Sequence, residues 1–228
     1  MQEKYYQNKL YPFQDRVLKV IQNLNLDFYL TGGTALSRCY LKHRYSDDLD
    51  FFVNDNPGFR SQCNMAIDLF KRSDWVCDIT TASDSFVRVF LEEGTLSMKV
   101  DFVNDVPFHY GDIESFLIFN QTDNWRNILS NKICALSRME AKDIADLICI
   151  AQQYSFEWED VIKEAKEKDL WVEPLGICKI IKEFPAELLL NIRWIIDINI
   201  DKMKGLLEIL HDDIFYGKLN SLFSSAEK

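Results

Sequence analysis

The sequence has few of the features from which disulfide frameworks, metal clusters and membrane spans are built. Its six cysteines form no C-x-x-C pair and its three histidines lie far apart, so a zinc or redox-metal site has little support. A chain of 228 residues that is 47% hydrophobic can build a core without disulfides, which favours free thiols in a reducing compartment. No apolar run is long enough for a membrane span, and the N-terminus has no apolar segment of the signal-peptide kind. We expect a globular, soluble and cytoplasmic protein with no membrane partner.

Basic residues are also in deficit. The chain has 26 Lys and Arg against 36 Asp and Glu, which gives a formal net charge of -10. A molecule of this sign is not built for indiscriminate binding of polyanions. Any contact with nucleic acid is therefore expected to be local.

Internal repeats, low-complexity tracts and Pro/Gly-rich linkers are absent, so a domain boundary has to come from a change of pattern near residue 120. Before it, short β-type runs alternate with helical runs, which is typical of a mixed sheet with flanking helices. The expected helices cover 13–24, 34–42 and 60–71, and the expected strands cover 28–31, 49–53, 75–80, 86–92 and 96–103, with Glu93-Gly94 as a turn and one or two more strands in 106–119.

The second half of the chain has the apolar spacing of helices. This spacing runs from Trp125 to Ala165, and Pro174 and Pro185 are expected to separate later helices. Segments 188–199 and 202–211 would close a helical bundle. The sequence predicts an α+β fold with an α/β domain over residues 1–120 and a helical domain over residues 121–228.

Three stretches in the first half belong together by their chemistry: Thr31-Gly32-Gly33-Thr34, Asp48-Leu49-Asp50-Phe51 and Val100-Asp101-Phe102. Asp48 and Asp50 are two residues apart in strand-like sequence, so both side chains leave the same face of the sheet. Two adjacent carboxylates repel each other unless a cation neutralises them, which favours Mg²⁺. Asp101 is an ionisable residue in an apolar run, where it is expected to be paired or coordinated. The pattern predicts a metal-dependent nucleotidyl transfer site with Asp48, Asp50 and Asp101 as metal ligands.

The glycine pair follows a predicted strand and precedes a predicted helix. Such a loop lets backbone N–H groups at a helix N-terminus approach phosphate. The loop is not a P-loop, because it has no G-K-[ST] ending, and a Gly-Gly pair alone is as often an ordinary tight turn. Asp-x-Asp alone is equally weak, so the order of the three stretches is what favours a site.

Charged residues of the helical half have a structural and a functional interpretation. Lys132 and Arg138 fit a solvated helix face when each is taken alone. Asp143 and Asp146 share one side of a helix at i and i+3, where either could pair with Arg138 or Lys142 instead of serving a substrate. Both interpretations stay open at this point.

Four runs have the residues and the order of a known family. They are Gly32-Gly33-Thr34-Ala35-Leu36, Arg44-Tyr45-Ser46-Asp47-Asp48-Leu49-Asp50-Phe51, Asn131-Lys132-Ile133-Cys134-Ala135-Leu136 and Arg138-Met139-Glu140-Ala141-Lys142-Asp143-Ile144-Ala145-Asp146-Leu147. They resemble the AbiEii/AbiGii-type nucleotidyltransferases, toxin components of bacterial toxin–antitoxin and phage-abortive systems within the DNA polymerase beta-like superfamily. One departure is Lys142-Asp143, where members often have Arg-Asp, so that the charge is kept but the bidentate fork is lost.

The resemblance implies a nucleotidyltransferase-type mixed sheet followed by a helical bundle. It implies that Asp48 and Asp50 bind metal, and that Asp101 completes the site and orients or deprotonates the attacking hydroxyl. It also implies that Lys132 contacts the triphosphate and that Arg44 and Ser46 lie at the mouth of a cleft. The nucleotide-binding residues expected in this way are Gly32, Gly33, Thr34, Arg44, Ser46, Lys132 and Asp143.

The expected activity is transfer of an NMP from an NTP such as ATP to an acceptor hydroxyl, assisted by two Mg²⁺ ions. The resemblance makes an RNA or tRNA end the favoured acceptor and an antitoxin protein an expected partner. Two alternatives stay open: a nucleotidyltransferase that acts on a small molecule or a protein, and a nucleotide-binding module without catalysis. Retention of all three carboxylates favours catalysis.

Overall fold

The computed structural model describes residues 2–223, which form two compact units. The sheet unit comprises the residues up to Ala35 together with Tyr45–Asn124, and the helical unit comprises Leu36–Arg44 together with the residues from Trp125 onward. The segment Leu36–Arg44 belongs to the helical unit because its π-helix η2 (Leu36–Leu41) packs against α5 and α6 of that unit. A single boundary near residue 120 does not describe this excursion.

The sheet unit is built on five strands. They are β1 (Tyr29–Thr31), β2 (Leu49–Asn54), β3 (Val76–Ala82), β4 (Phe86–Glu93) and β5 (Leu96–Asp105), in the spatial order β1-β2-β5-β4-β3. β2 and β5 are parallel, and the other neighbouring pairs are antiparallel. The predicted α+β class with a mixed sheet in the first half is confirmed.

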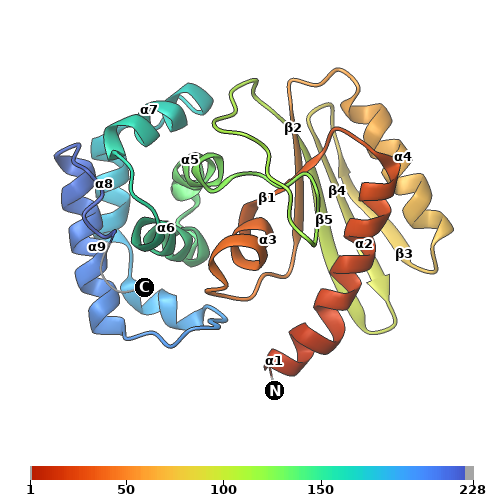
Figure 1. Cartoon of the computed structure of the whole chain (residues 1–228), viewed down its shortest axis with the longest axis horizontal. Coiled ribbons are helices and arrows are strands. Elements are labelled where there is room, and N and C mark those ends of the chain that lie inside the picture. Colours follow the sequence, from red (N-terminus) through yellow and green to blue (C-terminus); the bar gives the residue numbers. More distant parts are fainter. Residues whose placement is uncertain (1, 224–228) are drawn as a thin grey trace. The chain divides into compact units, whose positions relative to one another are not determined.

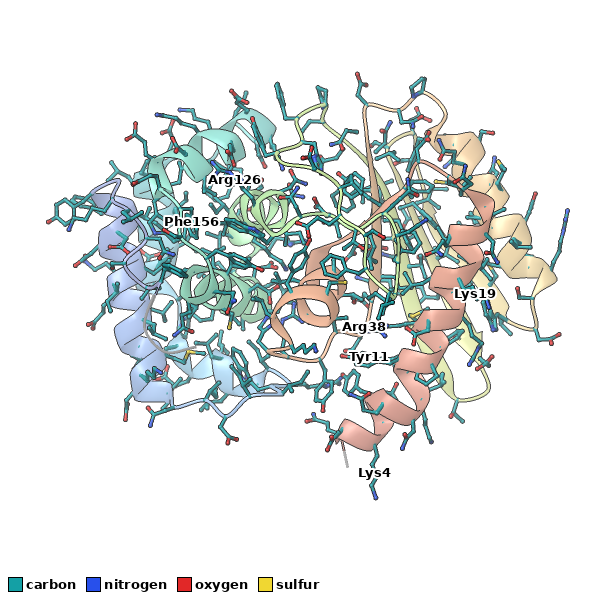
Figure 2. The ribbon with its side chains drawn as sticks, in the orientation of Figure 1. Lys4, Tyr11, Lys19, Arg38, Arg126 and Phe156 are labelled. Atoms are coloured by element: carbon teal, nitrogen blue, oxygen red, sulfur yellow. The ribbon has the colours of Figure 1, made fainter. Side chains whose placement is uncertain are left out.

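Helices cover one face of this sheet. The first is a continuous helical stretch of α1 (Gln2–Tyr5), the π-helix η1 (Tyr6–Leu10) and α2 (Tyr11–Leu24), and α4 (Phe59–Arg72) lies beside α2 (Figure 1). Tyr11 is buried and Lys19 exposed on α2, as the single apolar stripe of an amphipathic helix requires (Figure 2). Aromatic rings fill the space between the helices and the sheet: Phe28, Phe59, Phe70 and Phe102 contact one another there.

Alternation along the strands separates a core face from a second face. In β2, Leu49, Phe51 and Val53 are buried, whereas Asp50 and Phe52 between them are partly exposed. The hairpin between β4 and β5 turns at Gly94-Thr95, one residue later than predicted, and Gly94 has φ +61°. The expectation of further strands in 106–119 is wrong, because this described segment forms only an isolated bridge between Glu114 and Thr122.

The helical unit contains α5 (Trp125–Ala135), the 3₁₀ turn η3 (Leu136–Arg138), α6 (Ala141–Gln153), α7 (Trp158–Lys168), α8 (Pro174–Glu183), the 3₁₀ helix η4 (Ala186–Asn191) and α9 (Ile200–Phe215). α5 packs against α6 and α7, and α8 packs against α9. Arg126 on α5 pairs with Glu164 on α7, and Phe156 packs edge-on against Trp158. Figure 2 labels Arg126 and Phe156 in this unit. None of the helices in residues 2–223 is long and apolar enough to cross a membrane.

Two predicted helices differ from the observed ones. The helix expected over 34–42 is a short α3 (Gly32–Ala35) that continues as the π-helix η2. The helix expected over 188–199 ends at Asn191 as a 3₁₀ helix, because the backbone beyond it bonds elsewhere: the N–H of Ile195 donates to the carbonyl of His43 at 2.9 Å, and Trp194 bridges to Arg44. A contact between segments 150 residues apart in the chain overrides the local helical spacing.

Candidate active site

A row of polar side chains crosses four neighbouring strands on the face of the sheet opposite the core. Thr31 of β1 is paired with Asp50 of β2, Asp50 with Asp101 of β5, and Asp101 with Arg88 of β4. Residues paired directly across a ladder point to the same face, so the register itself brings Asp50 and Asp101 together. The sequence pattern singled out Thr31, Asp50 and Asp101, but not Arg88.

Gly32 brings backbone against the Asp50 carboxylate. Its φ of +67° lies in the left-handed region, and a Cβ placed on it would be 2.5 Å from Oδ2 of Asp50. Only glycine therefore fits between β1 and this carboxylate. Gly33 and Thr34 are buried in the short helix α3 that follows.

Asp48 lies one residue before β2, in a segment without strand pairing. Its backbone carbonyl accepts a hydrogen bond from the hydroxyl of Thr34, which also bonds to the Ser46 hydroxyl at 2.9 Å. The predicted residues Thr34, Ser46 and Asp48 are thus brought together by direct contact. Asp47 points its carboxylate elsewhere, to the hydroxyl of Tyr6 at 2.5 Å.

Two basic residues neutralise the carboxylates of this face. Nζ of Lys99 lies 2.9 Å from Oδ2 of Asp48 and 3.4 Å from Oδ2 of Asp101. Arg88 donates from Nε and Nη2 to the two oxygens of Asp101, each at 2.8 Å. We call Asp48, Asp50, Arg88, Lys99 and Asp101 the sheet cluster.

The charges of the sheet cluster act on its bases. Burial works to lower the pKa of Lys99, but the hydrogen bond and charge of Asp48, with the charges of Asp101 and Asp50, outweigh burial and raise that pKa. The hydrogen bond to Asp101 is the largest cause of the raised pKa of Arg88. Both bases are therefore held in their charged forms by the aspartates.

The sheet cluster has donor atoms that suit a divalent cation, but no ready-made group of three ligands. Among residues 2–223, no group of three His, Cys, Asp or Glu side chains stands ready to hold a metal ion. The donor chemistry fits all the same, since hard carboxylate oxygens suit Mg²⁺ and the Lys99 ammonium already places a positive group between Asp48 and Asp101. A metal ion bound by both Asp48 and Asp101 would have to displace that ammonium.

The helical unit holds a second set of predicted residues around Asp146. Arg44 donates from Nε and Nη2 to the two oxygens of Asp146 at 2.7 and 2.8 Å, and Nε2 of His43 lies 2.8 Å from Oδ1. Nζ of Lys132 lies 2.7 Å from both Asp143 Oδ1 and Asp146 Oδ2. We call His43, Arg44, Lys132, Asp143 and Asp146 the buried cluster, because at most 8% of any of these residues is exposed.

The charged groups of the buried cluster shift the pKa values of one another. Burial works to raise the pKa of Asp146, but the charges of Arg44 and Lys132 and the hydrogen bonds from Arg44 and His43 hold it well below its usual range. Burial works to lower the pKa of Lys132, yet Asp146 and Asp143 raise it. The network keeps charged groups charged inside the unit.

The structure shows which partners the charged residues of the helical half have. Asp143 accepts a hydrogen bond from Arg138 at 3.0 Å as well as the one from Lys132, so the predicted pairing with Arg138 is present, and Lys142 is exposed. Lys132 does not lie on a solvated face; it is buried between two carboxylates. Its expected contact with a triphosphate stays a prediction.

Sequence reasoning missed the bases of the sheet cluster and the role of the histidines. Lys99 had a signal, because it stands two residues before Asp101 and thus on the same face of a strand. Arg88 had none, since its place opposite Asp101 depends on the register of β4. His109 lies 3.0 Å from Asp123, whose other oxygen accepts a hydrogen bond from Thr31 at 2.6 Å, and this contact also joins distant parts of the chain.

Comparisons with known proteins agree with this architecture. A curated relative, the uncharacterized protein aq_aa25 of Aquifex aeolicus (strain VF5), is 29% identical over 170 residues, which cover 70% of this chain and 76% of that protein. The crystal structure of JHP933 from Helicobacter pylori has a TM-score of 0.59 at 20% identity and covers 91% of this chain and 93% of its own. A candidate nucleotidyltransferase from H. pylori gives 0.58 at 20% identity, with 90% and 94% covered. At this identity, the likeness of the two structures shows a shared fold.

A family model spans most of the chain. The model described as "Nucleotidyl transferase AbiEii toxin, Type IV TA system" matches residues 16–220, which include the sheet cluster and the buried cluster. The resemblance inferred from the four sequence runs is confirmed. The chain belongs to the AbiEii family of nucleotidyl transferase toxins.

Proposed function

We propose that this protein is a metal-dependent nucleotidyltransferase that moves an NMP from an NTP to an acceptor hydroxyl. The observation that carries the proposal is the register that aligns Asp50 with Asp101 on one face, with Asp48 beside them and Gly32 against the Asp50 carboxylate. Three carboxylates gather on one face, where Asp101 is buried and Asp48 and Asp50 are partly exposed, and their hard oxygens are of the kind that hold Mg²⁺ for phosphoryl transfer. Family membership supports the same class of reaction.

The carboxylates have separate roles in this proposal. Asp48, Asp50 and Asp101 would hold Mg²⁺, two ions in all, which when bound supplies charge stabilisation for the triphosphate. Asp101 also orients the acceptor hydroxyl, and the paired hydrogen bonds from Arg88 fix the orientation of its carboxylate. Gly32, Gly33 and Thr34 present backbone near the carboxylates, where phosphate can approach.

The proposed reaction needs only the NTP and the acceptor, and it involves no change of oxidation state. The acceptor oxygen forms a bond to the α-phosphorus of the NTP, and the bond between that phosphorus and the bridging oxygen to the β-phosphate breaks. Pyrophosphate leaves with the electron pair of the broken bond. The proton of the acceptor hydroxyl passes to Asp101 and from there to solvent.

An RNA or tRNA end is the acceptor that we favour, and a cognate antitoxin is the expected protein partner. The antitoxin partner follows from the family description, which names a toxin of a toxin–antitoxin system, whereas the RNA acceptor follows only from the sequence resemblance. The net charge of -10 means that an RNA acceptor would be held by local contacts and would bind with only modest salt dependence. Growth inhibition on expression, relieved by Asp50→Asn, is the result expected of a toxin.

The direct test is incubation of the purified protein with Mg²⁺, total RNA and each α-³²P-labelled NTP in turn. We expect label in RNA, reduced by about 1,000-fold in Asp50→Asn, because that variant removes a carboxylate that faces the transferred group. Asp105→Asn is the matched control, since Asp105 stands on β5, on the same face as Asp101 and four residues further along that strand. It should keep wild-type activity.

Three other outcomes have distinct meanings. Label in protein or in a small molecule would keep the enzyme and change the acceptor. Thermal stabilisation by NTP and Mg²⁺ that Asp50→Asn abolishes, without transfer of any label, would identify a nucleotide-binding module. Absence of both transfer and stabilisation with every NTP would reject the proposal.

A further inference from the structure

The three carboxylates of the sheet cluster are not held in the same way. Asp50 and Asp101 lie within β2 and β5, where ladder hydrogen bonds on both sides fix their backbones. Asp48 precedes β2 and has no ladder partner. Its side chain pairs with Lys99 of β5, but contacts outside the ladder must set the position of its backbone.

Side chains hold the backbone at this point. Nε2 of Gln14 donates to the carbonyls of Ser46 and Asp47, each at 3.1 Å, and the hydroxyl of Thr34 donates to the carbonyl of Asp48. Three successive carbonyls are thus bound by side chains where a strand would have used backbone amides. Gln14 is fully buried, so both of its hydrogen bonds are shielded from water.

Tyr6 holds the same segment through its side chains, whereas Gln14 binds its backbone. Its ring stacks on the ring of Tyr45 with centroids 4.1 Å apart and planes 11° from parallel. Its hydroxyl donates to the Asp47 carboxylate at 2.5 Å. Tyr6 is itself fully buried, and with Gln14 it contacts each residue from Tyr45 to Asp47.

The sequence of the N-terminal helix shows that this contact is specific. Leu10, Phe13, Val17 and Ile21 form the apolar stripe of the helix, and Gln14 interrupts it with a polar amide. A buried amide is unfavourable unless its hydrogen bonds are made, so an apolar residue would serve packing better. What the amide adds is a fixed geometry for the loop that it binds.

We propose that Tyr6 and Gln14 form a brace that sets the position of Asp48, with Gln14 as a positioning residue for the sheet cluster. Both residues lie before Arg16, where the match to the family model begins, whereas the segment that they contact lies inside the match. The inference deepens the proposed function and rests on it for the role of Asp48. The brace itself rests only on the contacts above.

The test compares two buried amides that make the same kind of contact. Asn220 in the helical unit donates from Nδ2 to the carbonyls of Ala151 and Tyr154 at 2.6 and 2.7 Å, as Gln14 does to Ser46 and Asp47. Gln14→Met and Asn220→Leu each remove one such pair of hydrogen bonds and put an apolar side chain of similar size in place of the amide. Both variants should lose thermal stability, which makes Asn220→Leu the control for a merely structural effect.

Two measurements separate positioning from stability. We expect Gln14→Met to weaken Mn²⁺ binding, followed by electron paramagnetic resonance, by about 10-fold or more, while Asn220→Leu leaves it unchanged. Amide hydrogen exchange in residues 45–49 should speed up by about 10-fold in Gln14→Met and not in Asn220→Leu, because the loop opens locally. Tyr6→Phe keeps the ring stack and removes one hydrogen bond, so it should show both changes to a smaller extent and serves if Gln14→Met does not fold.

The outcomes are distinguishable. Wild-type exchange in residues 45–49 for both Gln14→Met and Tyr6→Phe would overturn the brace. Faster exchange with unchanged Mn²⁺ affinity would overturn the positioning of Asp48 and leave a structural brace. Failure of the wild-type protein to bind Mn²⁺ would count against the proposed function, and the exchange measurement would still decide the brace.

Discussion

In the sheet cluster, aspartates and bases meet on a face that water reaches in part: the side chain of Arg88 is 36% exposed, that of Asp48 32%, that of Lys99 23% and that of Asp101 8%. In the buried cluster, the same kinds of side chain meet inside the helical unit, and Asp143 and Asp146 are fully buried. Charges that water can reach exchange partners at little cost, whereas a charge deprived of its partner in a protein interior is strongly destabilising. The first arrangement suits a site that takes up cations, and the second suits a fixed scaffold.

The largest effect is expected from removal of a charge in the buried cluster. Asp146→Asn removes the charge that faces Arg44, His43 and Lys132, so those groups stay buried with too little negative charge. We expect the free energy of unfolding in urea to fall by about 3–5 kcal/mol. Glu164→Gln, which breaks a half-exposed pair with Arg126, is the control and should cost about 1 kcal/mol or less. Equal losses would remove the distinction between scaffold and surface.

The next effect tests whether the Asp50 carboxylate needs the backbone of Gly32. Gly32→Ala and Gly94→Ala both place a side chain at a left-handed φ, at a common cost of about 1–2 kcal/mol. Only Gly32→Ala meets Asp50, since a Cβ on Gly94 has no neighbour within 4 Å. The value of kcat/KM for nucleotidyl transfer should fall by about 100-fold in Gly32→Ala alone. A similar loss of kcat/KM in both variants would mean that the loss does not come from displacement of the Asp50 carboxylate.

A smaller effect concerns acid stability. The pKa of Asp146 is lowered in the folded protein, so its contribution is complete above the unfolded value of about 4 and is lost as the pH falls below it. The stability gap between the wild type and Asp146→Asn should be constant from pH 7 to about 5 and then narrow by up to about 1.4 kcal/mol per pH unit. Urea unfolding at each pH measures it. A gap that widens on acidification would contradict the lowered pKa.

The smallest effect is expected from removal of a positive charge in the sheet cluster. Lys99→Met removes the ammonium that a metal ion has to displace, and an ion pair of this exposure is worth up to about 1 kcal/mol, so Mn²⁺ affinity should rise by about fivefold. Lys71→Met, on the exposed side of α4, should leave the affinity unchanged. Weaker Mn²⁺ binding in Lys99→Met would show instead that the ammonium assists the cation site.

Local pattern was enough to predict the framework of the sheet unit. Alternation placed β2 and β5 to within one or two residues, and strand periodicity placed Asp50 on the exposed face. The partners of these carboxylates could not be found in the same way. Arg88 reaches Asp101 through the register of a hairpin, and hairpin register depends on a turn that lay one residue from its predicted position.

Long-range contacts account for most of what the sequence withheld. Arg44 and Lys132 are 88 positions apart, yet both bind Asp146, and no local spacing carries that information. The loss of helix after Asn191 has the same origin, in backbone contacts with His43 and Arg44. Gln14 is the exception: a polar residue at an apolar-periodic position in a predicted helix was a readable signal of a specific buried contact.

The register between β2 and β5 has a consequence for how the chain folds. These parallel neighbours are separated in sequence by α4, β3 and β4, so they pair only after a long loop has closed. A slip of one residue in β5 would turn Asp101 into the core and bring Val100 and Phe102 out to the open face. Burying that aspartate against Phe28 and Phe70 would be strongly unfavourable. The Asp101 carboxylate therefore destabilises the misaligned register and favours the native one.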